Sequence, residues 1–209
     1  MDLQAEGILL TTAYLPPLSW VKTAVKAGKV TIEAHESYSR QTFRNRCRLV
    51  TANGLVSLSI PVVKHSGQKT KTKDVKIFYG DPWQRSHWRT IDAAYSNSPF
   101  YLYYKDELAP FFRHKYQFLI DLNMALCEKL FDLIGVDIYM RQTEKYEVRP
   151  EGIRDLRDAF YPKKKNDIEL PPYSQVFEER QGFIRDLSII DLLFNEGPAT
   201  REYLKNSEL

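Results

Sequence analysis

Residues 7–34 read GILLTTAYLPPLSWVKTAVKAGKVTIEA and combine three local patterns. The apolar run at 7–12 suits a buried strand, and residues 29–34 alternate like a second strand. Between them, apolar residues at helical spacing from Leu18 to Val25 predict a helix that ends at Gly28. A strand, a helix and a strand in this order are typical of parallel pairing with a helical crossover. We therefore predict an α/β fold with a mostly parallel, Rossmann-like sheet.

The next segment predicts an antiparallel β-hairpin that extends this fold. Asn53-Gly54 is a strong two-residue turn signal. With these two residues as the loop, Leu49 faces Leu58 on a packed side. The alternation then places three arginines together on the other side: Arg44, Arg46 and Arg48.

The rest of the chain alternates between further predicted elements. Asp81 as N-cap and Pro82 in the first turn indicate the start of a helix. The expected elements are a strand at 75–79, helices at 83–95 and 111–134, a strand at 136–140 and a short helix at 187–196. A lysine-rich loop at 64–73 reads as a solvated segment, with a lid over an anionic substrate as the minor alternative. We expect one domain over 1–209, in which 161–182 is an exposed Pro/Lys-rich connection to the C-terminal helix.

Composition excludes several classes of protein. The chain of 209 residues carries 30 basic and 27 acidic side chains, a net charge of +3, which is too even for a dedicated nucleic-acid binder. Cys47 and Cys127 are isolated thiols, which suggests a reducing compartment. No stretch has the length and apolarity of a membrane span, and the N-terminus lacks the pattern of a secretion signal. We expect a cytoplasmic protein.

Two groups of titratable residues are candidates for catalysis. His87 falls inside the apolar stripe of the 83–95 helix, where a core histidine is the favoured interpretation and a general base at a pocket wall the alternative. Glu33, His35 and Glu36 end a predicted strand, which is where α/β proteins bind ligands. A solvated loop is the alternative there. These ligands are too few to predict a metal site, and no HExxH pattern is present.

The arginine side of the hairpin suggests anion binding. Like charges on a strand often just keep an edge soluble. However, the planar guanidinium group suits bidentate contact with carboxylate or phosphate. Glu33 and Glu36 are expected to pair with the arginines in the empty protein, and a phosphorylated substrate would displace them. The loop before the first helix lacks the glycines of a dinucleotide or P-loop site.

Five motifs in order resemble the WbqC-like protein family: YLPPLSW, YSRQTFRNRCRL, NGLVSLSIPV, DPWQRSHWRTIDAAYSNSPFYLYY and GFIRDLSIIDLLFNEGP. The resemblance runs from about residue 9 to 198. It implies a role near O-antigen biosynthesis, with transfer of glycine or another small acyl group onto an amino sugar. By motif, the residues that match are Tyr14, Pro16, Trp20, Arg44, Asn45, Arg46, His87, Trp88, Arg89 and Asn195. Thr12-Ala13 stands where many relatives carry Gln-Pro, and Glu33 and Glu36 stand where relatives carry aspartates.

Together these features favour a transferase that acts on a nucleotide-linked amino sugar. In this hypothesis Arg44, Arg46 and Arg89 hold phosphates, together with Asn45, Trp88, Tyr14 and Trp20 as substrate-binding residues. His87 or His35 takes the amine proton, and Glu33 or Glu36 orients the imidazole. The alternatives are a nucleotidyltransferase-like enzyme and a non-catalytic protein that binds a glycan or a partner. The sequence identifies no cofactor.

Overall fold

The computed structural model describes residues 7–63, 70–164 and 166–206, so most of the lysine-rich loop lies outside the described residues. Within this part, four parallel strands form a sheet in the order β5-β2-β1-β6. They are β1 (Ile8–Thr11), β2 (Lys29–Glu33), β5 (Tyr139–Gln142) and β6 (Arg154–Asp155). The register pairs Ile8 with Val30 and with Arg154. This confirms the predicted α/β class with a mostly parallel sheet.

Helix α1 (Leu18–Ala27) is the predicted crossover between β1 and β2. It ends where expected, because Gly28 adopts φ 68° and its N–H bonds to the carbonyl of Ala24. At the other end, the carboxylate of Asp186 accepts a 2.8 Å hydrogen bond from the N–H of Ser19. The backbone of Leu187 accepts another from Leu18. A segment from the C-terminal motif therefore accepts hydrogen bonds from N–H groups at the start of α1, which is where a phosphate would otherwise bind.

The two faces of the parallel sheet have different surroundings. Leu10, Val30 and Ile32 point to one face and belong to the main hydrophobic core. Leu9 and Thr31 point to the other, where they line a cavity together with the β5–β6 connection. This cavity, here called the sheet-edge cavity, has a volume of about 460 Å³.

The predicted hairpin forms from β3 (Arg46–Thr51) and β4 (Gly54–Ser59). Its register differs from the expected one: Leu49 pairs with Val56, and Thr51 pairs with Gly54. The turn is therefore made by Ala52 and Asn53, and Gly54 begins the returning strand at φ 104°. A shift of two residues keeps every side chain on its predicted side, so Leu49 is still buried.

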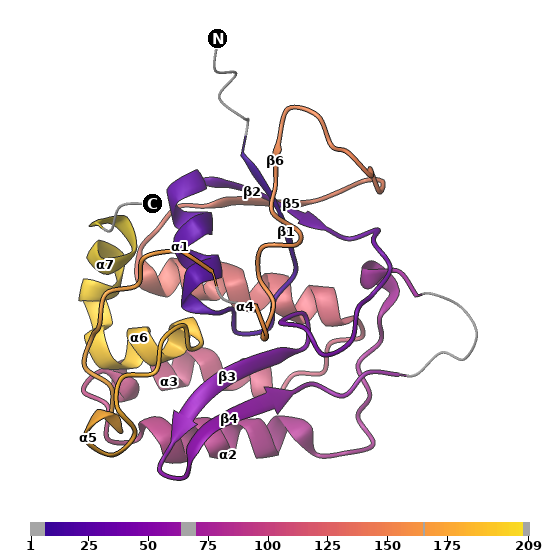
Figure 1. Cartoon of the computed structure of the whole chain (residues 1–209). Coiled ribbons are helices and arrows are strands. Elements are labelled where there is room, and N and C mark those ends of the chain that lie inside the picture. The colour runs from indigo at the N-terminus through magenta and orange to yellow at the C-terminus, as the bar shows by residue number, and fades with distance from the viewer. Residues whose placement is uncertain (1–6, 64–69, 165, 207–209) are drawn as a thin grey trace.

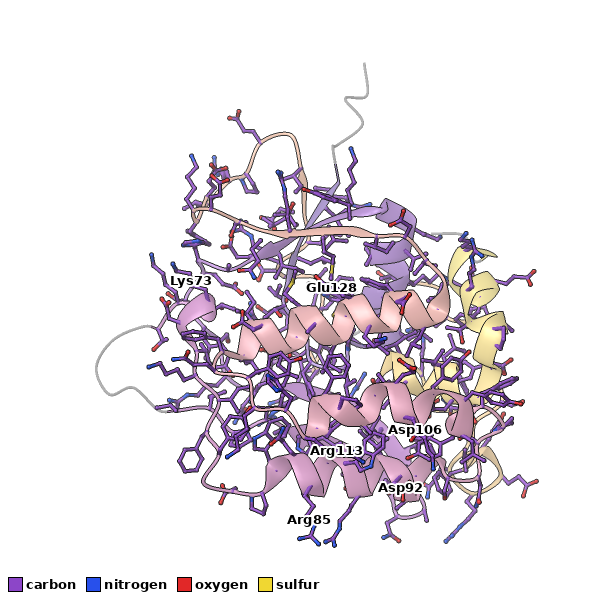
Figure 2. The ribbon with its side chains drawn as sticks, turned by 180° about the vertical axis from the view of Figure 1, so that it is seen from behind. Lys73, Arg85, Asp92, Asp106, Arg113 and Glu128 are labelled. Carbon is purple, nitrogen blue, oxygen red and sulfur yellow. The ribbon has the colours of Figure 1, made fainter. Side chains whose placement is uncertain are left out.

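Figure 1 shows α4 (Leu119–Ile134) running between the parallel sheet and the hairpin. Figure 2, from behind, shows α4, α3 (Tyr101–Leu108) and α2 (Trp83–Tyr95) one below another. The C-terminal helices α6 (Ile189–Glu196) and α7 (Thr200–Asn206) pack beside α1. Single helical turns complete the described structure: η1 (Thr72–Asp74), η2 (Ala109–Phe112), α5 (Glu178–Gln181) and η3 (Gly197–Ala199).

Two further sequence predictions are wrong, and the pairing of two distant segments explains both. The helix expected at 111–134 begins only at Leu119, and the strand expected at 75–79 is not a regular strand. Instead, Ile77 donates to the carbonyl of Gln117, and Leu119 donates to that of Val75. This pairing holds the chain extended before α4, where local periodicity favours a helix.

The segment 161–182 is not exposed throughout. Leu170, Tyr173 and Gln175 are buried within it. The Tyr173 hydroxyl donates to the carboxylate of Asp191 on α6 at 2.6 Å. None of the described helices is long and apolar enough to cross a membrane.

Candidate functional site

A cavity of about 530 Å³ opens where the hairpin meets two loops, and we call it the arginine cavity. One loop leads from β2 into β3, and the other precedes α2. Backbone hydrogen bonds from Val63 to Lys76 and from Phe78 to Pro61 fasten the second loop beside β4. The lining residues are Tyr38, Arg40, Gln41, Asn45, Arg46, Ser59, Ile60, Pro61, Val62, Phe78 and Asp81.

Three buried polar atoms of this lining have no hydrogen-bond partner within the described residues: Arg46 Nε, Tyr38 Oη and Asn45 Oδ1. The amide of Asn45 is held in place because its Nδ2 donates to the carbonyl of Ile60 at 2.9 Å. Buried polar groups are nearly always satisfied in folded proteins. Three such atoms belong to residues that line one cavity, and because the atoms themselves are buried, a ligand in the cavity would reach them once these side chains shift.

The charge around these atoms favours an anion. Burial raises the pKa of Tyr38 to about 12, and the positive charges of Arg44, Arg40 and Arg46 act against that rise. The guanidinium of Arg46 makes no ion pair within the part of the chain that the structure describes. Arg46 Nε and the Tyr38 hydroxyl can both donate to an anionic oxygen.

Asp81 is an exposed acidic residue in the lining of the same cavity. The sequence predicted this residue as the N-cap of the following helix, but α2 begins at Trp83 with Pro82 in the cap position and without a side-chain cap hydrogen bond. The Asp81 backbone carbonyl, not its carboxylate, accepts from the N–H of Trp83. The carboxylate is therefore not used by the helix.

Arg44 is separated from Arg46 because it lies in the turn before β3 and not in the strand. Its buried guanidinium contacts Glu36, with Nε and the nearer terminal nitrogen 2.8 and 2.7 Å from the same oxygen Oε1. Burial raises the pKa of Glu36 and the Arg44 charge opposes this. The expected pairing of an arginine with Glu36 thus occurs, and it leaves Arg46 as the hairpin arginine that faces the cavity.

Glu33 lies at the carboxyl end of β2, where it lines the sheet-edge cavity instead. Its buried carboxylate accepts from Thr143 Oγ1 at 3.0 Å and from Arg157 at 3.2 Å. The guanidinium of Arg157 also contacts Asp155 at the end of β6, at 2.6 Å. The Glu33 carboxylate accepts a further hydrogen bond from the backbone N–H of His35. This network connects the ends of the strands and uses both oxygens of Glu33.

His87 occupies the interior, as in the favoured interpretation. Its Nδ1 lies 2.9 Å from the hydroxyl of Tyr14. Burial lowers the pKa of His87 to about 4, so the imidazole is neutral at pH 7. Tyr14 and Trp20 are buried too, and the indole N–H of Trp20 donates to the carbonyl of Thr11. His87, Tyr14 and Trp20 are not part of the linings of the sheet-edge cavity and the arginine cavity.

Trp88 and Arg89 belong to another part of α2. Trp88 packs against Phe112 with ring centroids 5.2 Å apart. Arg89 is exposed and lines a third cavity between the hairpin turn and α2, here called the turn cavity. The neighbouring Arg85 in that lining points away from the body of the molecule (Figure 2). The structure therefore brings Arg46 and Asn45 together and places Arg89 elsewhere.

Sequence reasoning missed Tyr38, Phe78 and Asp81 as lining residues of the arginine cavity. Their spacing carried no signal, because residues 38–46, 59–62 and 78–81 meet only through tertiary contacts. The motif match to YSRQTFRNRCRL did include Tyr38 and Arg40. Among the described residues, no group of three His, Cys, Asp or Glu side chains is arranged to hold a metal ion.

Comparison with known proteins agrees with the motif pattern. The uncharacterized protein Rv1507c of Mycobacterium tuberculosis is 22% identical over 223 residues, covering 94% of this chain and 96% of that protein. No solved structure gives a significant match. The model of the WbqC-like protein family matches residues 12–159, which contain the hairpin, α2 and every residue that lines the arginine cavity. The chain belongs to the WbqC-like protein family.

Proposed function

We propose that this protein is a transferase that acts on a nucleotide-linked amino sugar in surface-polysaccharide biosynthesis. Transfer of a glycyl or other small acyl group onto the sugar amine is the reaction that we favour. The observation that carries the proposal is that Arg46 and Tyr38, which both line the arginine cavity, each have a buried polar atom without a partner among the described residues. A diphosphate would supply acceptor oxygens to both groups.

One residue of the same cavity lining is able to accept the proton that the amine loses. In the proposed reaction the amine nitrogen attacks the acyl carbon of an activated donor, for example a thioester. An amide bond forms, the bond to the donor's carrier breaks, and the amine loses a proton. Asp81 is the carboxylate of the described lining and is the proposed acceptor of that proton. Four residues with predicted catalytic roles are not part of this lining: His35, His87, Glu33 and Glu36. Those roles stay predictions.

A cytoplasmic location belongs to the same proposal, because nucleotide-linked sugars and thioester donors are made and used inside cells.

The first test is a ligand screen followed by a turnover assay. Thermal shifts would be measured with UDP-, dTDP- and GDP-linked amino sugars, with and without thioester donors. We expect stabilisation by at least one nucleotide-linked sugar, because a ligand that binds the folded state raises its unfolding temperature. Mass spectrometry would then detect the acylated sugar. Absence of any shift across the set would contradict the proposal.

A second candidate is binding without turnover. It is favoured by one observation: among the described residues, no histidine lines the arginine cavity. A nucleotide-linked sugar that binds tightly and yields no product with any acyl donor would support this candidate. Loss of product formation in Asp81→Asn with retained binding would instead support the transferase.

A further inference from the structure

The arginine cavity has an aromatic edge that the proposed function does not yet use. Phe78 lines the cavity and is 45% exposed. Its backbone is well held: the N–H of Phe78 donates to the carbonyl of Pro61 at 2.9 Å, and the neighbouring Ile77 pairs with Val62. The ring therefore stands on a fixed backbone beside a cavity that is lined both by polar groups and by the apolar residues Ile60, Pro61 and Val62.

Gly80 determines where the Phe78 ring can lie. A Cβ atom at position 80 would be 2.2 Å from Cζ and 2.6 Å from Cε1 of Phe78, closer than any real contact. Gly80 does not have a positive φ, so no left-handed backbone conformation requires a glycine there. The missing side chain at position 80 thus leaves space for the Phe78 ring. An alanine there must push the ring out of its present place.

We propose that the Phe78 ring is a stacking surface for the nucleobase of a nucleotide whose phosphates are bound by Arg40 and Arg46. This inference rests on the proposed function and narrows it: the ligand is recognised as a nucleoside diphosphate and not only as a sugar phosphate. An exposed ring stacks on any base because every base has a π face. The basic and aromatic groups of one cavity would then bind the two ends of the nucleotide.

A single exposed phenylalanine on a protein surface needs no explanation by itself. Phe78 differs in two respects that can be seen in the structure. It shares a cavity with the orphan atoms of Arg46 and Tyr38, and a glycine two residues later leaves the space that the ring occupies.

Two kinds of ligand, with and without a base, separate base recognition from phosphate recognition. Affinities for the nucleoside diphosphates of uridine, thymidine, guanosine and adenosine would be measured by calorimetry beside inorganic pyrophosphate, which has no base. Phe78→Ala is expected to weaken nucleoside diphosphate binding about 10-fold and to leave pyrophosphate binding unchanged. Phe78→Trp should retain the affinity, since it keeps an aromatic ring. Gly80→Ala should act in the direction of Phe78→Ala.

A matched control is Leu102→Ala, which removes another exposed apolar side chain (67% exposed, on α3) that does not line the cavity. It should change neither affinity. Equal binding of nucleoside diphosphate by the wild type and Phe78→Ala would overturn the stacking proposal, as would an equal loss for both ligands. If either result is found but Arg46→Ala still weakens binding of the nucleoside diphosphate, the proposed function stands without the stacking proposal. If the wild type binds neither ligand, the proposed function fails and the stacking proposal with it.

Discussion

Arg44, Arg46 and Arg48 are close in sequence, and each meets a different environment. Arg44 is paired with Glu36, and Arg48 donates to the backbone carbonyl of Asp186 at 2.9 Å. Arg46 alone of these three lines the arginine cavity. Alternation along a strand predicted that all three arginines share a side, but Arg44 lies before β3, and the partners of these side chains come from other segments that alternation does not reveal.

At the residue scale, the most costly single change is expected at Arg157. Arg157→Ala leaves the Glu33 carboxylate buried and without its counter-charge, since Glu33 is 1% exposed. Removing one partner of a buried ion pair costs roughly 3–5 kcal/mol of unfolding free energy. Urea denaturation would measure it. Lys129→Ala, which breaks an exposed pair with Glu107, is the control and should cost less than about 1 kcal/mol. Similar losses in both variants would contradict the buried network.

The pH dependence of stability should report on Asp191. This carboxylate is fully buried on α6 and accepts hydrogen bonds from Tyr95, Tyr173 and Gln175. Burial raises its pKa from 3.8 to about 6, against the effect of these hydrogen bonds. Between about pH 4 and pH 6 the folded state therefore binds more protons than the unfolded state, and this group's contribution to stability falls as pH rises.

We expect the unfolding free energy of the wild type minus that of Asp191→Asn to decrease across this pH interval. Denaturation at several pH values would measure the difference, in which the other titrating groups cancel. A difference that grows with pH would mean that the hydrogen bonds, and not burial, dominate the pKa of Asp191.

At the scale of elements, local signals predicted the helices and strands that depend on nearest neighbours. Gly28 ends α1 and Gly135 ends α4, both in the left-handed conformation. One error lies where distant segments pair, because contacts with residues 75–77 hold the chain before α4 extended. The other error is local: the hairpin turn lies one position earlier than predicted, and Thr51 pairs with Gly54.

The connection between α6 and α7 gives a prediction at this scale. Gly197 adopts φ 53°, and a Cβ there would lie 2.4 Å from Cδ1 of Phe100. Gly197→Ala should therefore destabilise the fold by about 2 kcal/mol through overpacking and backbone strain. Gly152→Ala is the matched control, because Gly152 also has a positive φ of 72° but nothing within 4 Å of the added atom. Equal losses of unfolding free energy would assign the effect to the backbone alone.

At the scale of the whole molecule, family motifs that are far apart in sequence meet around α1 and the hairpin. Ser188 donates hydrogen bonds to the backbone carbonyls of Arg48 and Leu15. These bonds join the C-terminal motif to the motifs YSRQTFRNRCRL and YLPPLSW. The sequence predicted the class of fold and two residues of the arginine cavity, Asn45 and Arg46. The other lining residues required the tertiary arrangement of the 38–41 and 78–81 loops. A single domain over 1–209 remains a prediction.

An anionic ligand is expected to bind at Arg46 and not in the sheet-edge cavity or the turn cavity. A crystal structure of the protein with a bound nucleotide-linked amino sugar would show the site. We expect phosphate oxygens within hydrogen-bonding distance of Arg46 Nε and of the Tyr38 hydroxyl, two groups that lack partners among the described residues. Phosphates bound beside Glu33 in the sheet-edge cavity, or beside Arg89 in the turn cavity, would contradict the account.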